Sequence, residues 1–174
     1  MKKIVFGITS LTLGGAERVL VDIVNKLKYE YDITIFTLYR GGEFEKSLDK
    51  EIKIKSLYSE LYTNMNWIKR KIASLRVLFL KNHIYKKYIK GKYDIEIAFL
   101  EGPITRLFSV RKDETRKIAW VHNDMSKIYG NSKKSKLKIK ADTKAYVNYN
   151  ELIFVSQDNL DAFNKVYKDV ERNK

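Results

Sequence analysis

A glycine pair, an acid and a histidine are the residues best suited to chemistry, and each follows a short apolar run. Gly14 and Gly15 come after residues 4–8, Glu101 comes after residues 93–100, and His122 comes after residues 117–121. A glycine pair between a strand and a helix permits positive φ and leaves room for a ligand, and the helix N–H groups beyond it favour an anion such as phosphate. A carboxylate can accept hydrogen bonds from sugar hydroxyls or act as a base. A loop histidine can serve as a general base, as a hydrogen-bond donor to a phosphate, or as a ligand of a sugar.

Each of these residues also has a structural interpretation that the sequence leaves open. The glycine pair can be only a tight turn, and Glu101 can be an acid favoured by the dipole of a following helix. His122 can be bonded only to backbone. Arg18, in the first turn of the first helix, can reach a phosphate or form a surface salt bridge. Asn123 can bind a sugar or form a turn with Asp124, and for Asp124 we favour the turn.

Several known site types are excluded by spacing. The glycines do not form the three-glycine G-x-G-x-x-G pattern of dinucleotide sites, because Gly7 lies too far upstream, and no Gly-Lys-Ser/Thr follows. This spacing argues against a nicotinamide-dependent enzyme. The chain has no cysteine and only two histidines, so no zinc-ligand spacing is present and we expect no metal site. His83 falls mid-helix among lysines, where a surface or packing role is expected.

Apolar runs alternate with helical patterns along the whole chain. Strands are expected at residues 4–8, 32–38, 51–57, 93–100, 117–121 and 151–155, with helices between them and the third strand at an edge of the sheet. Pro103 suits the first turn of a helix, a loop and then a helix are expected in the lysine-rich stretch before residue 145, and Ser156 can cap the last helix. The pattern predicts an α/β fold in one domain: a doubly wound, mostly parallel Rossmann-like sheet with helices on both faces. The polar residues above would then meet at the carboxyl edge of the sheet.

One long helix is expected at residues 65–90, capped by Thr63 or Asn64 and ended by Gly91. It combines apolar residues at helical spacing with many cations, and no Asp or Glu occurs from residue 61 to residue 93. A helix on an anionic membrane surface has this composition. The alternative is that the apolar stripe packs on the sheet and the lysines face water. The candidate membrane-surface residues are Lys69, Arg70, Arg76, Lys81, Lys86 and Lys87, with a second candidate stretch at residues 126–140.

The 174-residue chain carries a formal net charge of +14. This charge predicts an anionic partner, which could be nucleic acid, an acidic membrane or a phosphorylated substrate. A lysine-rich composition typical of AT-rich genomes is the alternative explanation. No apolar run approaches a membrane span and the amino terminus does not form a signal peptide, so a cytoplasmic location is expected. A basic nucleic-acid-binding module, or a non-catalytic Rossmann-like binding module, is the rival function, although no nucleic-acid-binding motif is present.

Four stretches of the chain resemble the amino-terminal domain of family-4 glycosyltransferases of the GT-B fold. They are residues 3–6 with the Leu-Gly-Gly-Ala-Glu-Arg-Val sequence at 13–19, residues 94–102, residues 117–123 and residues 153–156. The glycine-containing stretch is the most specific of these. The resemblance is greatest to bacterial enzymes that build capsular polysaccharide or exopolysaccharide.

The resemblance implies a retaining, metal-independent hexosyltransferase without a cofactor, whose donor substrate is a nucleotide-sugar, with a UDP-sugar expected. His122 would contact the transferred sugar, and Gly14, Gly15 and Arg18 would lie near the donor diphosphate. Glu101 and Asn123 would lie on the side of the acceptor, a lipid-linked oligosaccharide at the inner face of the cell membrane. Nucleic acid is not expected as a partner.

The resemblance also implies how the chain is divided. Residues 1–168 would form the acceptor-side domain and residues 169–174 would begin a linker. The carboxyl-terminal donor-binding domain would then be missing from these 174 residues, and the chain alone is expected to be inactive.

Overall fold

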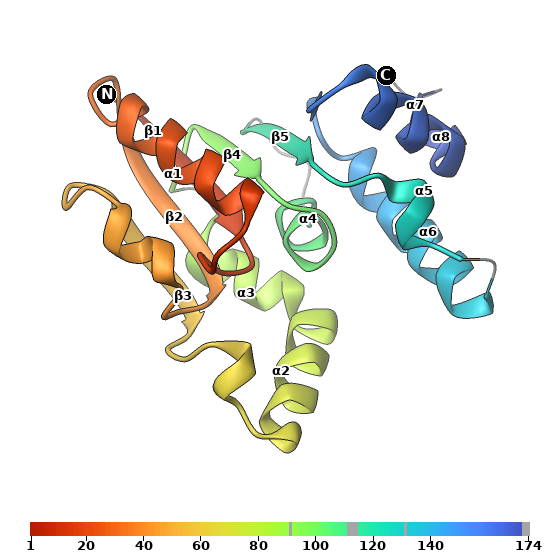
Figure 1. Ribbon diagram of the computed structural model, residues 1–174, viewed down its shortest axis with the longest axis horizontal. Helices are drawn as coiled ribbons and strands as arrows, with labels where there is room; N and C mark the ends of the chain where they lie inside the picture. The colour runs from red at the N-terminus through yellow and green to blue at the C-terminus, as the bar shows by residue number, and fades with distance from the viewer. Residues whose placement is uncertain (91, 111–114, 131, 172–174) are drawn as a thin grey trace.

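Six parallel strands form a single sheet in the order β3-β2-β1-β4-β5-β6 (Figure 1). The computed structural model describes residues 1–90, 92–110, 115–130 and 132–171. The strands are β1 (Lys2–Ile8), β2 (Tyr31–Tyr39), β3 (Lys53–Tyr58), β4 (Ile95–Ala98), β5 (Arg116–Val121) and β6 (Glu151–Phe154). The predicted doubly wound α/β fold is therefore confirmed, with β3 at one edge as expected.

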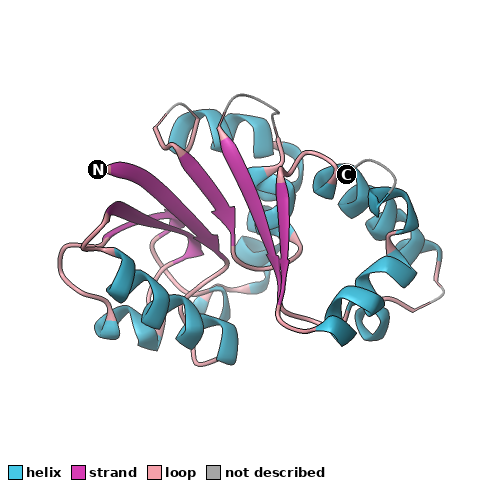
Figure 2. Cartoon of the chain, turned by 90° about the horizontal axis from the view of Figure 1, so that it is seen from above, coloured by secondary structure: helices cyan, strands magenta, loops and turns pink. Residues whose placement is uncertain are grey.

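Helices connect the strands on both sides of the sheet (Figure 2). They are α1 (Gly15–Leu27), α2 (Trp67–Phe79), α3 (Lys81–Tyr88), α4 (Pro103–Phe108), α5 (Met125–Ile128), α6 (Lys133–Tyr146), α7 (Gln157–Val166) and α8 (Lys168–Glu171), with short 3₁₀ helices η1 (Glu43–Ser47) and η2 (Tyr62–Asn64). Ser156 caps α7 as predicted, by accepting a hydrogen bond from the backbone N–H of Asn159. Val170, in the stretch expected to begin a linker, is buried in the core.

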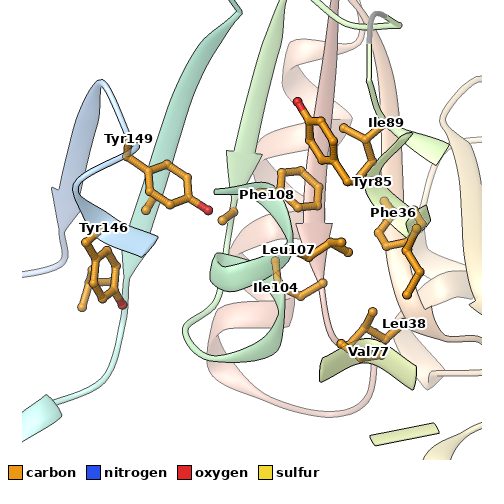
Figure 3. Packing of buried hydrophobic residues seen from close by; sticks show 14 of the residues in the cluster. Phe36, Leu38, Val77, Tyr85, Ile89, Ile104, Leu107, Phe108, Tyr146 and Tyr149 are labelled. Carbon is orange, nitrogen blue, oxygen red and sulfur yellow. The ribbon is translucent and has the colours of Figure 1, made fainter. Parts of the chain in front are cut away.

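The two faces of the sheet contribute to two separate cores because side chains alternate along each strand. Ile4, Phe6 and Ile8 of β1 pack with α1 and η1 on one face. Val5 of the same strand joins the larger core under α3, α4 and α6, part of which Figure 3 shows. A central strand buried on both faces reads as a continuous apolar run, which explains the composition of residues 4–8.

Strand order brings the predicted site residues to one edge. β4 lies between β1 and β5 and pairs with both in parallel register. The loops that follow these three strands therefore emerge side by side at the carboxyl edge of the sheet. They carry the glycine pair, Glu101 and His122 respectively.

The prediction of one continuous helix at residues 65–90 is wrong. The segment divides at Leu80 (φ −105°, ψ 16°) into α2 and α3. Asn66 caps α2 by accepting a hydrogen bond from the backbone N–H of Lys69, so the expected caps at Thr63 and Asn64 are also wrong. The division lets α3 place Tyr85 against the sheet, where its hydroxyl meets charged side chains. Gly91, the expected end of the helix, lies outside the described residues.

The two helices differ in what they bury. α3 buries Ile84 and Tyr85 in the core, as the packing alternative required. α2 buries only Ala73 and Val77. Its apolar face points to solvent: Ile68, Ile72, Leu75 and Phe79 are between 45% and 74% exposed. These four residues, spaced at helical intervals opposite the buried face, are called the α2 stripe below.

A buried ion pair joins α3, β4 and β5. The Lys117 ammonium lies 2.5 Å from the Glu96 carboxylate, and both side chains are at most 1% exposed. Lys117 also donates hydrogen bonds to the Tyr85 hydroxyl at 2.7 Å and to the Phe108 carbonyl at 3.1 Å. Burying two charges is costly unless each is paired and hydrogen-bonded, as here.

We expect Lys117→Met to lower the free energy of unfolding by about 3–5 kcal/mol, because Glu96 would keep its charge in the core without its cation. Urea denaturation measures the change. Lys2→Met, at an exposed position of β1, is the matched control and should change the free energy by less than about 0.5 kcal/mol. Equal effects of the two substitutions would contradict the interpretation.

Candidate functional site

The carboxylate of Glu101 holds the turn that follows β5. Its Oε1 accepts hydrogen bonds from the backbone N–H groups of His122 at 2.5 Å and Asn123 at 2.7 Å, and its Oε2 accepts one from the Asn123 amide at 2.8 Å. Hydrogen bonds to an ionised acceptor are stronger than neutral ones. Both oxygens are thus engaged within the protein, and Glu101 acts on the site by fixing the position of the His122 turn.

Gly102, the residue after Glu101, has a backbone conformation that favours glycine. Its backbone has φ +87° and ψ −123°, a conformation that L side chains rarely adopt. The chain reverses there and enters α4 directly at Pro103. Glu101, just before this reversal, binds the turn after β5 through its carboxylate.

His122 is half-buried and contacts two aromatic rings, which also contact each other. Its ring centroid lies 4.7 Å from that of Phe99, and it stacks on Trp120 at 5.7 Å with an interplanar angle of 15°. Its Nε2 is shielded from solvent and has no hydrogen-bond partner among the described residues. A hydrogen bond from this nitrogen to a sugar therefore requires movement of the ring or of the residues that cover it.

Burial lowers the pKa of His122 below its ordinary value of 6.5. The negative charge of Glu101 and the backbone of Phe99 act in the opposite direction, but desolvation is the larger effect. His122 is therefore neutral at neutral pH. A neutral imidazole can accept a proton, as a general base must.

The remaining polar residues of this turn have structural partners. The backbone carbonyl of Asn123 accepts a hydrogen bond from the buried Asn159 amide at 2.8 Å, which ties the turn to α7. Asp124 caps α5 by accepting a hydrogen bond from the backbone N–H of Ser126, in agreement with the turn interpretation. This bonding and the nearby Lys127 lower the pKa of Asp124.

The loop between β1 and α1 is fixed by its neighbours. The Thr9 carbonyl accepts hydrogen bonds from the backbone N–H groups of Leu38 and Tyr39, and the Leu11 carbonyl accepts one from Phe44. Gly42 touches this loop so closely that a Cβ there would lie 2.2 Å from the Leu11 backbone. The loop that leads to the glycine pair is therefore rigidly placed.

The glycine pair does not use positive φ, so that part of the sequence prediction is wrong. Gly14 is extended (φ −172°) and Gly15 begins α1. A Cβ on Gly15 would meet no atom within 4 Å, and one on Gly14 would meet only the flexible Glu17 carboxylate. Internal packing therefore does not explain the absence of side chains here, and the backbone at Gly15 is open to a ligand.

Arg18 follows the structural interpretation, since its guanidinium pairs with Asp22 on the exposed side of α1 at 3.3 Å. The structure thus brings Glu101, His122 and Asn123 together by direct hydrogen bonds. Gly14, Gly15 and Arg18 lie at the same edge of the sheet, and among the described residues they form no hydrogen bond or ion pair with that cluster.

The six predicted membrane-surface cations have different surroundings. Arg70 is folded back on the turn before α2, where it donates hydrogen bonds to the carbonyls of Met65 and Thr63. Lys69 pairs with Glu60 at 3.0 Å, and Arg76 lies over the Tyr58 ring. Over the described ranges, no carboxylate lies within salt-bridge distance of the other three, which are Lys81, Lys86 and Lys87.

Two further absences hold for the residues that the structure describes. No three residues of the types His, Cys, Asp and Glu gather into a possible metal site. None of the helices in this part of the chain has the length and apolar character needed to cross a bilayer.

Sequence reasoning missed three features of the site. Asn159 and the aromatic neighbours Phe99 and Trp120 support the His122 turn, although they belong to a helix and two strands predicted only as packing elements. Gly102 could have been found from the Glu-Gly-Pro sequence, because glycine before proline at a strand end often marks a reversal.

Comparison with known proteins supports the fold and finds a related sequence, which matches part of this chain. No protein-family model matches the chain. A stretch of 102 residues, 58% of this chain, is 37% identical to a Campylobacter jejuni enzyme and covers 26% of that enzyme. The enzyme is GalNAc-alpha-(1->4)-GalNAc-alpha-(1->3)-diNAcBac-PP-undecaprenol alpha-1,4-N-acetyl-D-galactosaminyltransferase.

Solved structures show the same architecture. Anabaena Alr3699/HepE, solved with UDP and glucose and also with UDP-glucose, superposes with a TM-score of 0.62 over 98% of this chain and 42% of HepE, at 16% identity. Phytolacca americana UGT2 superposes with a TM-score of 0.55 over 88% of this chain and 45% of UGT2, at 8% identity. The chain is thus similar in sequence to a bacterial glycosyltransferase over part of its length, and it shares the α/β fold of these structural neighbours. The chain spans about a quarter of the Campylobacter enzyme and less than half of either structural neighbour.

We expect the His122 imidazole to titrate below 6.5 in NMR spectra, because burial opposes its charged form. Glu101→Gln should lower the midpoint further, since it removes the negative charge that favours the imidazolium. The His83 resonance, assigned by substitution, is the internal reference.

The lowered pKa of His122 also makes the stability of the folded state depend on pH. Because the unfolded state binds a proton near pH 6.5 more readily than the folded state, His122 reduces stability as pH falls through 6.5 towards its folded-state pKa. A midpoint above 6.5 in the wild-type protein would contradict this account.

Proposed function

We propose that the chain is the acceptor-binding half of a retaining glycosyltransferase. The enzyme moves a hexosyl group from a nucleotide-sugar, a UDP-sugar, to a lipid-linked glycan during synthesis of capsular polysaccharide or exopolysaccharide. The observation that carries the proposal is the 37% identity to an enzyme whose name specifies an undecaprenyl-diphosphate-linked glycan as acceptor. The structures of HepE with UDP and glucose support the choice of donor.

Within this proposal His122 contacts the transferred sugar near the reaction centre. Its neutral state and its place at the same edge of the sheet as the glycine loop support this role. Glu101 is a positioning residue for His122, because both carboxylate oxygens already bind the turn. Asn123 lies beside it on the acceptor side. No step of the proposed reaction requires a metal or a cofactor.

The glycine pair takes the donor diphosphate in this scheme. The backbone at Gly15 is open, and the N-terminus of the 13-residue helix α1 favours an anion. Arg18 would have to exchange Asp22 for a phosphate, which is inexpensive for an exposed pair. The rest of the donor site would come from a second Rossmann-like domain of the whole protein, because this chain covers only 42% of HepE.

We expect His122→Ala to reduce sugar transfer by at least about 100-fold, as loss of a group that assists proton transfer does. The assay follows labelled sugar from a panel of UDP-sugars onto undecaprenyl-diphosphate glycans, catalysed by the full gene product that contains this chain. His83→Ala, at an exposed position of α3, is the control and should retain the wild-type rate.

Two outcomes would contradict the assignment. Transfer unaffected by His122→Ala would remove His122 from the reaction centre. Absence of transfer with every donor, together with salt-sensitive binding of random oligonucleotides, would favour the nucleic-acid-binding alternative.

The α2 stripe is suited to bind the membrane in which a lipid-linked acceptor would lie. It exposes four large apolar side chains in a segment with no acidic residue from position 61 to position 93. An apolar helix face flanked only by cations complements an anionic lipid surface, with about 1 kcal/mol for each nearby cation. We propose that α2 docks the protein peripherally on the inner face of the cell membrane. The exposed lysines of α6, with the 70% exposed Leu137, form a second candidate membrane-binding surface.

We expect the double substitution Ile72→Gln and Leu75→Gln to weaken binding to vesicles that contain phosphatidylglycerol by about tenfold or more, because it removes two apolar side chains from the bilayer interface. Co-sedimentation measures the binding. Tyr29→Gln removes an apolar residue that is 77% exposed outside α2, and it should have no effect. Equal binding to neutral phosphatidylcholine vesicles would overturn the electrostatic part. If the wild-type protein instead aggregates and binds no vesicles, the α2 stripe packs on another protein surface and not on lipid.

A further inference from the structure

Two adjoining cavities lie at the carboxyl ends of β1 and β2, beneath α2. Their volumes are about 330 Å³ and 370 Å³, and both are lined by Thr9, Tyr39, Ser74 and Pro103. They therefore form one continuous depression, called the α2–α4 groove below. Its position is fixed, because α4 packs against both α2 and α6 and the Thr9 carbonyl is bonded to the end of β2.

The groove has apolar walls. Val77 and Leu78 of α2, Leu38 at the end of β2 and Pro103 of α4 line its larger half. No acidic residue of the described chain lines either half. Such a surface favours hydrocarbon over a sugar, whose hydroxyl groups would be left without hydrogen-bond partners.

Two cations stand at this apolar wall. Lys81, at the start of α3, has no carboxylate within salt-bridge distance among the described residues. Arg106 of α4 uses its Nε to bind Asp142 at 2.5 Å. Because Asp142 offsets Arg106, the groove keeps the net positive charge of Lys81, with the guanidinium close by. An apolar slot with a cation at its wall matches a ligand that joins hydrocarbon to phosphate.

The groove connects two surfaces already described. Leu78 lines it and is also 55% exposed on α2, one residue before Phe79 of the α2 stripe. At the opposite side Ser10 and Thr12 belong to the loop that leads to the glycine pair. A ligand that enters from the membrane side of α2 would thus pass along the groove towards the proposed reaction centre.

We propose that the α2–α4 groove binds a prenyl diphosphate, with the first isoprene units against Val77 and Leu78 and the diphosphate at Lys81 and Arg106. This inference rests on the proposed function, because it names how the lipid part of the acceptor is held. It adds that the protein recognises the hydrocarbon itself, so membrane docking through the α2 stripe and acceptor binding are separate events.

Calorimetric titration of the 174-residue chain with three soluble probes tests the chemistry. Farnesyl diphosphate carries both parts of the ligand, farnesol only the hydrocarbon, and inorganic pyrophosphate only the charge. We expect farnesyl diphosphate to bind at least about tenfold more tightly than either of the others. Equal affinity of pyrophosphate, or of farnesol, would overturn the inference, as would absence of binding by farnesyl diphosphate.

Matched substitutions test the location. Ser74→Phe fills the groove, whereas Ile72→Phe adds a similar ring to the outward face of the same helix, and both positions are exposed. Only the first should abolish farnesyl diphosphate binding. Lys81→Gln should weaken the binding of farnesyl diphosphate by about tenfold and leave the binding of farnesol unchanged. Lys87→Gln, outside the groove, should change the affinity for neither probe. Wild-type binding by Ser74→Phe or Lys81→Gln would place the site elsewhere.

The failure of this inference is distinguishable from failure of the proposed function. Sugar transfer to undecaprenyl-diphosphate glycans by the full gene product, without farnesyl diphosphate binding to the groove, would overturn only the inference about the groove. Binding of farnesyl diphosphate without sugar transfer from any donor would overturn the proposed transferase activity.

Discussion

Two carboxylates at opposite ends of β4 hold β5 in place, and the proposed site depends on this attachment. Glu96 pairs with Lys117 in the core near the beginning of β5, and Glu101 binds the backbone N–H groups of His122 and Asn123 beyond its end. Between these points the strands pair in parallel register. Because charge-assisted hydrogen bonds fix both ends, the imidazole of His122 is presented at the edge of the sheet in a defined position.

The same interactions explain how helix packing divides the basic segment after β3. Tyr85 of α3 reaches the buried pair, so α3 must lie against the sheet. α2 precedes it across the turn at Leu80 and has no comparable anchor, burying only Ala73 and Val77. A helix held at so few points keeps its other apolar side chains in solvent, which is unfavourable for an isolated soluble domain. A lipid surface next to the α2 stripe would remove that cost, and the groove beside it offers a route from the lipid to the loop between β1 and α1.

Glycines illustrate how one residue type serves different purposes. Gly102 is required by its positive φ, and Gly42 by the close approach of the Leu11 backbone. The glycine pair is required by neither, since Gly14 is extended and Gly15 faces open space. The sequence predicted that the pair would provide backbone freedom. In the structure its contribution is instead an accessible backbone at Gly15.

The sequence by itself determined the order of strands and helices, because period-2 and period-3.6 apolar patterns depend only on local geometry. It therefore predicted the sheet, the edge position of β3 and the strand ends at which Glu101 and His122 lie. Tertiary structure alone decided what those residues contact. Glu101 can reach the His122 turn because β4 lies beside β5, and no local pattern encodes which strands become neighbours. Likewise, an amphipathic segment reveals that it has an apolar face, but only packing against the rest of the chain decides whether that face is buried, as in α3, or left outward, as in α2.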